Sequence, residues 1–344
     1  MPTIRNVLEK RKLSPREDKA LLCLGVCLVL FAGLAVGAKA QEELDFTTGN
    51  LPEGFVIHDS VDLGLRQLYL MVTDRKGRRI TGLQRDDFTL EDNGQEQELI
   101  TFEGGDIPFT ALLLLDGSTS MKGGRLEISL AGARSFIAGM REHDEARILV
   151  YSDRILDAGE WQGPQDASTP NVQATGGTAL LDHVFLGLRI LAERHGRRVL
   201  VLLSDGWDLQ SVLDVDQVAA AVQRSEAILY WIRPANEEAS IRMARPGETP
   251  RILPVTSWRG KQELTETWET LDNLVERSGG RVVLVDRPEN VDAALQEVLQ
   301  ELREQYAIGY YPQGLRQDGS WRSVEVSADR PGARVRARKG YIDE

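Results

Sequence analysis

The sequence predicts an α/β fold, a doubly wound and mostly parallel sheet with small flanking β modules. Two uninterrupted apolar runs, 109–115 and 199–203, are typical of strands that are buried on both faces of a sheet. Around them, short apolar runs alternate with amphipathic stretches of helix length, which indicates parallel strands joined by crossover helices. With 344 residues, the chain is also long enough for more than one folded unit.

Residues 1–40 have the pattern of an export signal. Basic residues precede an uncharged apolar run at 20–38, and the small residues Ala38 and Ala40 fit the pattern that signal peptidases cleave. Cleavage after Ala40 is our first expectation, but an apolar run of this length can also just span a bilayer, so an uncleaved signal anchor fits as well. In either case we expect the rest of the chain to be exported: periplasmic, secreted, or anchored in the cytoplasmic membrane and facing outward.

The composition argues against two classes of site. Both cysteines, Cys23 and Cys27, lie in the apolar run, so cleavage leaves no thiol for a disulfide or a thiolate metal site. The net charge is -12, whereas a nucleic-acid binder needs a concentrated basic face. We therefore expect no nucleic-acid partner, and contact with a membrane only through the N-terminal segment if that segment stays uncleaved.

Two segments lie between the export signal and the α/β pattern. Residues 41–54 are polar and aperiodic, which predicts a linker. Residues 55–105 form a small β module of sandwich type, because short apolar or alternating runs are separated by turn sequences. A unit this small buries little surface, so we expect it to pack on its neighbour. Its expected strand regions are 68–72, 79–80, 88–90 and 99–102.

Residues 106–305 carry five strand-helix units in one domain. The expected strands are 109–115, 146–151, 199–203, 227–232 and 281–285, and the expected helices are 125–140, 179–194, 215–223, 264–278 and 291–304. Two long polar stretches, 159–176 and 236–263, interrupt the alternation. Loops of that length are often functional, and the first is expected near the functional end of the sheet.

Residues 306–344 contain two short strand regions, interpreted as a C-terminal β-hairpin extension that can join the N-terminal β module. A basic run at 330–339 alternates with small apolar residues. This pattern predicts an edge strand with a solvated face, and contact with a cell-surface polyanion is the alternative.

Polar side chains in three loops are expected to meet at one end of the sheet. Asp116, Ser118 and Ser120 follow the first buried strand, Thr178 opens a helix, and Asp205 follows the second buried strand. Ligands of open α/β sheets bind at the carboxyl ends of the strands, so these side chains should converge. An all-oxygen set without His or Cys points to a hard cation, Mg²⁺ first, with Mn²⁺ or Ca²⁺ possible. Taken singly, such residues are more often helix caps than metal ligands, so the hypothesis depends on the three loops together.

These pieces, D-x-S-x-S at 116–120, T-G-G-T at 175–178 and S-D-G at 204–206, resemble the metal-ion-dependent adhesion site of von Willebrand factor A (VWA) domains. The resemblance covers about residues 106–305. It implies a six-stranded, Rossmann-like sheet in the order 3-2-1-4-5-6 with one antiparallel edge strand. It also implies the metal ligands: Ser118, Ser120 and Thr178 by direct contact, and Asp116 and Asp205 directly or through water.

The flanking sequences extend the resemblance. Thr81-Gly82-Leu83, the stretch 305–312 and the final Lys339-Gly340-Tyr341 further resemble exported acidobacterial-type proteins with a related A domain. That similarity says little about the partner.

The expected function follows from the ion. Three hydroxyls and two carboxylates leave Mg²⁺ short of its six oxygens, and an Asp or Glu carboxylate of a partner protein is a natural further ligand. This predicts an extracytoplasmic, divalent-cation-dependent protein-binding module for adhesion or complex assembly. The alternatives are a structural envelope scaffold with an idle metal site and a metal-dependent hydrolase.

We expect no enzyme, because each catalytic motif lacks a part. The sequence has no G-x-x-x-x-G-K-[ST] for nucleotide phosphates, no H-E-x-x-H for zinc and no G-x-S-x-G elbow at 116–120. A haloacid-dehalogenase-type phosphatase wants a second aspartate where Ser118 stands.

Overall fold

The computed structural model describes residues 64–234 and 258–344. The predicted export signal, the linker and most of the polar stretch 236–263 therefore lie outside the described residues. Within the described part of the chain, no helix is both long enough and apolar enough to cross a membrane.

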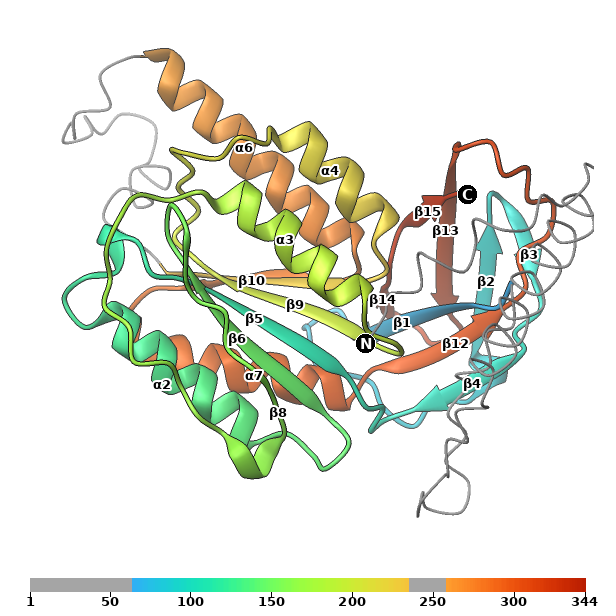
Figure 1. Cartoon of the computed structure of the whole chain (residues 1–344). Helices are drawn as coiled ribbons and strands as arrows, with labels where there is room; N and C mark the ends of the chain where they lie inside the picture. Colours follow the sequence, from blue (N-terminus) through green and yellow to red (C-terminus); the bar gives the residue numbers. More distant parts are fainter. Residues whose placement is uncertain (1–63, 235–257) are drawn as a thin grey trace, which may run out of the picture. The chain divides into compact units, whose positions relative to one another are not determined.

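A seven-stranded sheet forms the centre of the α/β part (Figure 1). Its main path runs β11-β10-β9-β5-β6-β7. When these six strands are numbered 1 to 6 in chain order and listed from the β7 edge, the order is 3-2-1-4-5-6. The parallel strands are β5 (Thr110–Asp116), β6 (Glu145–Tyr151), β9 (Arg198–Leu203), β10 (Ile228–Pro234) and β11 (Arg281–Val285). The edge strand β7 (Ile155–Asp157) is antiparallel to β6, as is the additional short β8 (Trp161–Gln162). The predicted doubly wound, mostly parallel sheet is confirmed.

Helices cover both faces of this sheet (Figure 1). One layer holds α2 (Arg125–Ala138) and α7 (Val291–Arg303), and the other holds α3 (Leu180–Ala192), α4 (Val215–Arg224) and α6 (Trp258–Arg277). Successive side chains of a strand point to opposite faces, so β5 sends Leu113 and Leu115 into the first layer and Leu112 and Leu114 into the second. This is why the residues 111–115 of β5 are all apolar.

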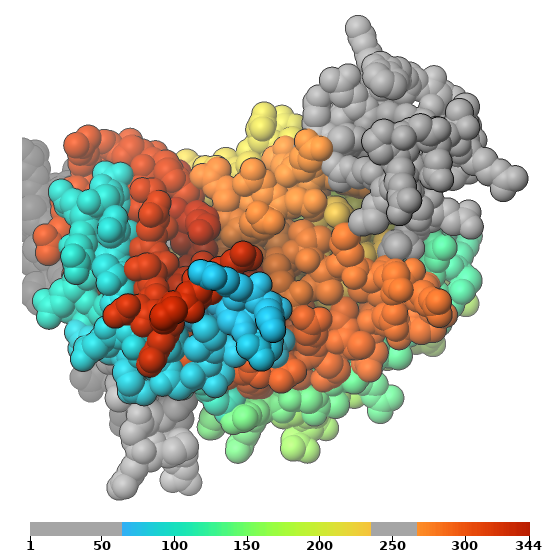
Figure 2. All heavy atoms as spheres, turned by 180° about the vertical axis from the view of Figure 1, so that it is seen from behind, coloured from blue at the N-terminus to red at the C-terminus, as the bar shows by residue number. Residues whose placement is uncertain are grey.

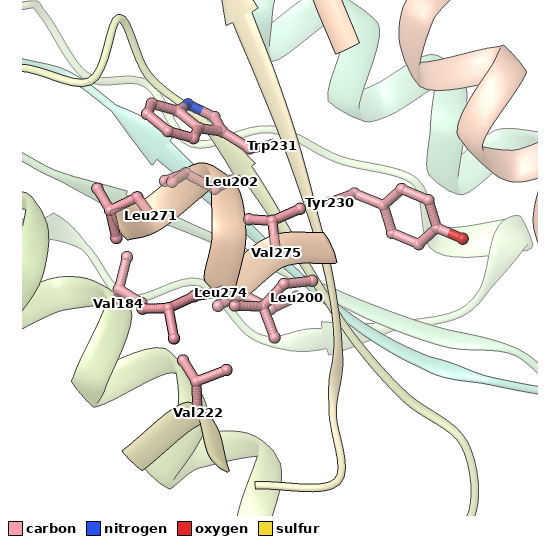
Figure 3. Close-up of a pocket in the computed structure, with 10 residues that line it drawn as sticks. Val184, Leu200, Leu202, Val222, Tyr230, Trp231, Leu271, Leu274 and Val275 are labelled. Carbon is pink, nitrogen blue, oxygen red and sulfur yellow. The ribbon is translucent and has the colours of Figure 1, made fainter. Parts of the chain in front are cut away.

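A small apolar cavity of about 10 Å³ remains in the second layer (Figure 3). It lies among Val184 of α3, Val222 of α4 and the α6 side chains Leu271, Leu274 and Val275. The Tyr230 hydroxyl points away from it. A volume this small barely admits one water molecule, and water needs polar partners that these aliphatic groups do not offer. The cavity is a packing gap of the core.

The remaining strands build two four-stranded sheets. One has the order β14-β1-β12-β4 and the other β15-β13-β2-β3. From the N-terminal side come β1 (Arg66–Thr73), β2 (Phe88–Asp92), β3 (Gln95–Gln97) and β4 (Thr101–Gly104). From the C-terminal side come β12 (Tyr306–Tyr310), β13 (Trp321–Ala328), β14 (Arg334–Arg336) and β15 (Gly340–Ile342). Figure 2 shows the N-terminal strands, in blue to cyan, beside the C-terminal strands, in red. We propose on this basis that 64–105 and 306–344 form one sandwich into which 106–305 is inserted.

Residues 306–344 contain no hairpin of the expected kind, because β12 and β13 lie in different sheets. β12 pairs with β1 on one side and β4 on the other, and β13 pairs with β2 and β15. β12 is thus an interior strand of its sheet, and all five of its residues are buried. The region 79–80 forms only an isolated bridge, Thr73 to Arg79.

The basic run 330–339 does form an edge strand, β14, but its basic face is solvated only in part. Arg330, Arg334 and Lys339 are exposed, whereas Arg336 and Arg338 are half-buried. Arg336 forms an ion pair with Glu301 of α7. Arg338 donates hydrogen bonds to the carbonyl oxygens of Ser225 (2.6 Å) and Val222 (3.1 Å), at the C-terminal end of α4. These arginines therefore attach the sandwich to the α/β part.

A buried arginine holds the two places where the chain crosses between the sandwich and the α/β part. The Arg197 side chain donates to the carbonyl oxygens of Ile107 (3.3 Å) and Leu302 (2.8 Å) and to the side chain of Gln305. Its guanidinium also lies over the ring of Tyr69 in β1, 5.2 Å from the ring centre. Burial lowers the pKa of Arg197. An arginine keeps its proton even when it is buried. The positive charge of Arg197 therefore depends on these oxygens and this ring for stabilisation.

Replacing Arg197 by methionine should therefore destabilise the whole unit. Arg197→Met leaves two buried carbonyl groups and Gln305 without their donor, and we expect a loss of about 3 kcal/mol in the free energy of unfolding. Urea denaturation measures it. The control is Arg194→Met, which removes a surface ion pair with Glu145 and should cost well under about 1 kcal/mol. Equal losses in the two variants would contradict the role given to Arg197.

Candidate functional site

The loop after β5 is organised by Asp116. This residue ends the strand and is fully buried. One of its oxygens accepts a hydrogen bond from the backbone N–H of Ser118, and the other accepts one from the hydroxyl of Ser204, both at 2.8 Å. The hydroxyls of Ser118 and Ser120 lie 3.0 Å apart. A single carboxylate thus fixes its own loop and ties it to the loop after β9.

The T-G-G-T loop is attached to the first loop through its backbone. The N–H of Thr175 donates to the carbonyl oxygen of Gly117 (2.8 Å), and both the N–H and the hydroxyl of Thr119 donate to the carbonyl oxygen of Gly176 (3.1 and 2.8 Å). Gly176 has φ +83°, and a Cβ there would lie 2.3 Å from a carboxylate oxygen of Asp153. Glycine is needed at this position for the two loops to meet.

The S-D-G loop packs on two tryptophans. Gly206 has φ +85°, and a Cβ there would lie 2.5 Å from the Trp231 ring. The indole N–H of Trp231 donates to the carbonyl oxygen of Ser204 (2.9 Å), and that of Trp268 donates to the carbonyl oxygen of Gly206. Asp205 is 4 % exposed, and one of its oxygens accepts from the N–H of Trp207 (3.3 Å). The loop is thus held by one tryptophan of β10 and one of α6.

The predicted site residues all lie in these three connected loops. Four of them are buried, namely Asp116, Ser118, Thr178 and Asp205, while Ser120 is exposed. Asp116 contacts Ser118 directly, and Ser118 contacts Ser120. Thr178 joins the group from another side, because its carbonyl oxygen accepts from the N–H groups of Leu209 and Gln210 just beyond the S-D-G motif, both at 3.0 Å. The five positions thus lie in three loops that are bonded to one another, and Ser120 is the one that is exposed to solvent.

The electrostatics of this cluster favour a cation. Burial first, and then the nearby Asp205 carboxylate, raise the pKa of Asp116 to about 6, against the lowering effect of the hydrogen bonds from Ser118 and Ser204. Two buried carboxylates that disfavour each other's charge gain from a divalent ion, which stabilises the ionised form of both. The residues present therefore fit a hard cation.

Hydroxyl groups have to contribute to any such site. Across the two described stretches, 64–234 and 258–344, no three His, Cys, Asp or Glu side chains gather so as to hold a metal ion. The two carboxylates alone leave a divalent ion with few ligands. The hydroxyls of Ser118, Ser120 and Thr178 are the additional oxygens that this cluster offers.

Several supporting residues were not predicted as part of the site. Ser204 bonds Asp116, and Tyr151, which lies opposite Asp116 in the β5–β6 pairing, stacks on His183 with ring centres 4.6 Å apart. Ser204 stands beside Asp205 in the S-D-G motif, so its sequence position was a usable signal. Nothing in the local pattern around Tyr151 or His183 indicates that their rings meet.

Removing the charge of Asp116 should stabilise the cation-free protein at neutral pH. A carboxyl group with a folded pKa of about 6, above its ordinary 3.8, binds its proton more tightly in the folded state. Its ionisation therefore weakens folding as the pH rises from about 4 to about 6, and the full penalty, at most about 3 kcal/mol, is present at pH 7. We expect Asp116→Asn to gain stability in chelator at pH 7 but little at pH 4, measured by urea denaturation.

The matched control is Asp86→Asn, at an exposed aspartate of the sandwich. It should change stability little at either pH. A gain for Asp116→Asn of the same size at pH 4 and pH 7 would show that burial of the charge is not its cause.

No protein-family model matches the sequence, and no curated protein does so either. Solved structures of similar fold include a von Willebrand factor type A protein from Catenulispora acidiphila (13% identity, 76% of this chain and 74% of that chain, TM-score 0.41). They also include the ArnB paralog VWA2 from Sulfolobus acidocaldarius (12% identity, 80% and 76%, TM-score 0.42). A third is an aerotolerance-related membrane protein from Bacteroides fragilis (15% identity, 56% and 99%, TM-score 0.37).

Likenesses this distant carry no conclusion about activity or partner. The fold rests on the chain's own strand order, 3-2-1-4-5-6 from the β7 edge, with antiparallel pairing at that edge. In these respects the α/β part of the chain has the fold of von Willebrand factor A domains, as its sequence motifs predicted.

Proposed function

We propose that this chain is a divalent-cation-dependent protein-binding module that acts outside the cytoplasm, in adhesion or in the assembly of a complex. The observation that carries the proposal is one cluster at the carboxyl end of β5. There the buried carboxylate of Asp116 lies near that of Asp205, and the hydroxyls of Ser118 and Ser120 are 3.0 Å apart.

The residues that would hold Mg²⁺ are Asp116, Ser118, Ser120, Thr178 and Asp205, with Mn²⁺ or Ca²⁺ as substitutes. When bound, the ion supplies a positive centre that accepts one more oxygen ligand. The chain's own contribution is preorganisation. Because Asp116 is fixed by two hydrogen bonds and its neighbours by those of the adjoining loops, little side-chain entropy remains to be lost on binding.

The exposure of the cluster indicates where a partner approaches. Ser120 is exposed, while the other four positions are buried. An oxygen from outside therefore arrives on the Ser120 side. Asp116 and Asp205 would hold the ion directly or through water. Where one of them acts only through water, the direct ligands neutralise the divalent charge incompletely, and an Asp or Glu side chain of the partner satisfies the ion better than water does.

Catalysis is not part of the proposal. The histidine beside the cluster, His183, is 6 % exposed, its Nδ1 lies 2.6 Å from the carbonyl oxygen of Ala179, and its ring stacks on Tyr151. Held in this way, it is poorly placed to take a proton from a bound substrate. The extracytoplasmic location rests on the export pattern of residues 1–40.

Thermal unfolding tests the cation site directly. Raising Mg²⁺ to a hundredfold excess over its dissociation constant should stabilise the native protein by about 2.7 kcal/mol, a shift of a few degrees. Ser118→Ala should lose this shift. Ser129→Ala is the control: it is an equally buried serine, but its hydroxyl bonds Arg125 in α2, so its variant should keep the shift.

A flat response of the native protein up to several millimolar of either Mg²⁺ or Mn²⁺ would overturn the proposal. The chain would then be better explained as an envelope scaffold with an idle site.

A further inference from the structure

Two aliphatic side chains stand in solvent beside the candidate cation site. Leu209 is 72 % exposed and Val212 is 91 % exposed. Among the large apolar side chains that the structure describes, these are the two highest values. Both belong to the loop between β9 and α4, which begins with the S-D-G motif.

Their exposure is not the result of a loose loop. The carboxylate of Asp182, in the first turn of α3, accepts hydrogen bonds from the N–H groups of Val212 (3.0 Å) and Leu213 (2.9 Å). The neighbouring Leu213 packs against the apolar layer below, so the loop does bury an apolar side chain where it can. The backbone holds Val212 outward.

Leu209 is fixed in the same manner and next to a candidate ligand. Its N–H donates to the carbonyl oxygen of Thr178 (3.0 Å). The preceding Asp208 accepts from the N–H of Leu181 at 2.8 Å and from that of Ser211 at 3.0 Å, which joins the loop to the start of α3. The Leu209–Val212 pair is thus a rigid apolar rim on one side of the site.

The loop after β5 gives the site a rim of different chemistry. Lys122 and Arg125 are both exposed, and the guanidinium of Arg125 donates to the carbonyl oxygen of Ser120 (3.0 Å). These two cations lie close to the exposed end of the site, on a chain whose net charge is -12. An acidic segment meets favourable charge here and repulsion over much of the remaining surface.

We propose that the partner presents a polypeptide segment in which an Asp or Glu, bound at the cation, is flanked by an aliphatic or aromatic residue that packs on Leu209 and Val212. This inference rests on the function proposed above and adds the chemistry of the partner. The carboxylate contributes metal dependence, and the apolar neighbour contributes discrimination among acidic segments. Exposed apolar groups that are already ordered lose little entropy when a partner covers them, which makes them effective anchors.

A peptide selection tests this recognition. The full chain is exposed, in Mg²⁺, to displayed peptides with one fixed central Asp and randomised flanking positions, and in parallel to a library with Asn at the centre. We expect binding of Asp peptides that chelator abolishes, with aliphatic or aromatic residues enriched beside the Asp.

Variants then connect the enrichment to the rim. A synthetic peptide from the selection should bind the double variant Leu209→Ser/Val212→Ser at least tenfold more weakly than the native chain. The matched control is Ile100→Ser/Leu315→Ser, which alters two side chains that are each 41 % exposed on the sandwich, and it should leave the affinity unchanged. Both double variants should keep the Mg²⁺-induced thermal shift, because none of these side chains supports the cation site.

The outcomes separate the two proposals. Metal-dependent selection of Asp peptides without apolar enrichment, or with equal affinity for the rim variant, overturns the rim and leaves the proposed function standing. If neither library shows metal-dependent binding, the carboxylate-binding function fails and the rim inference fails with it.

Discussion

The two hydrogen bonds accepted by the buried carboxylate of Asp116 are the constraint on which the site depends. One comes from its own loop, through the N–H of Ser118, and one from the loop after β9, through the hydroxyl of Ser204. A carboxylate at 0 % exposure is costly to ionise, and these donors offset only part of that cost. The same burial that disfavours the ionised carboxylate favours a bound cation, so the order of the loops and the affinity for a cation have one origin.

The sequence predicted the parts of this structure that arise from local pattern. The inner residues of β5 and β9 are apolar because both faces are covered, and Asp116 and Asp205 were found because each stands at the carboxyl end of such a strand. β3, with the sequence Gln-Glu-Gln, was missed because it has no apolar residue in it, although Gln97 is buried. The start of α6 at Trp258, six residues before the predicted start, lies in a polar stretch without helical periodicity.

Long-range partners explain the other differences. The alternation at 330–339 is that of an edge strand, but no local signal states that Arg336 reaches Glu301 or that Arg338 reaches the end of α4. Burial lowers the pKa of Arg338 to about 10, which reflects how much water this contact excludes. Likewise, the local sequence of β12 predicts half of a hairpin. Its position in the sheet is determined by its pairing with β1 and β4, which are distant in the sequence. Local sequence patterns cannot predict such contacts, because the residues that make them are far apart in the sequence.

The placement of the two crossings has a mechanical consequence. Both tie the α/β part to the sandwich at the amino end of β5, whereas the candidate site lies at the carboxyl end, roughly 20 Å away along the strand. A partner pulling on the site would load β5 lengthwise and pass the tension to the sandwich. There the strand that leads into β5 is β4, which pairs with β12 over all four of its residues, so a pull along it strains several hydrogen bonds together. Strands loaded in this shearing geometry resist separation better than strands peeled apart one bond at a time.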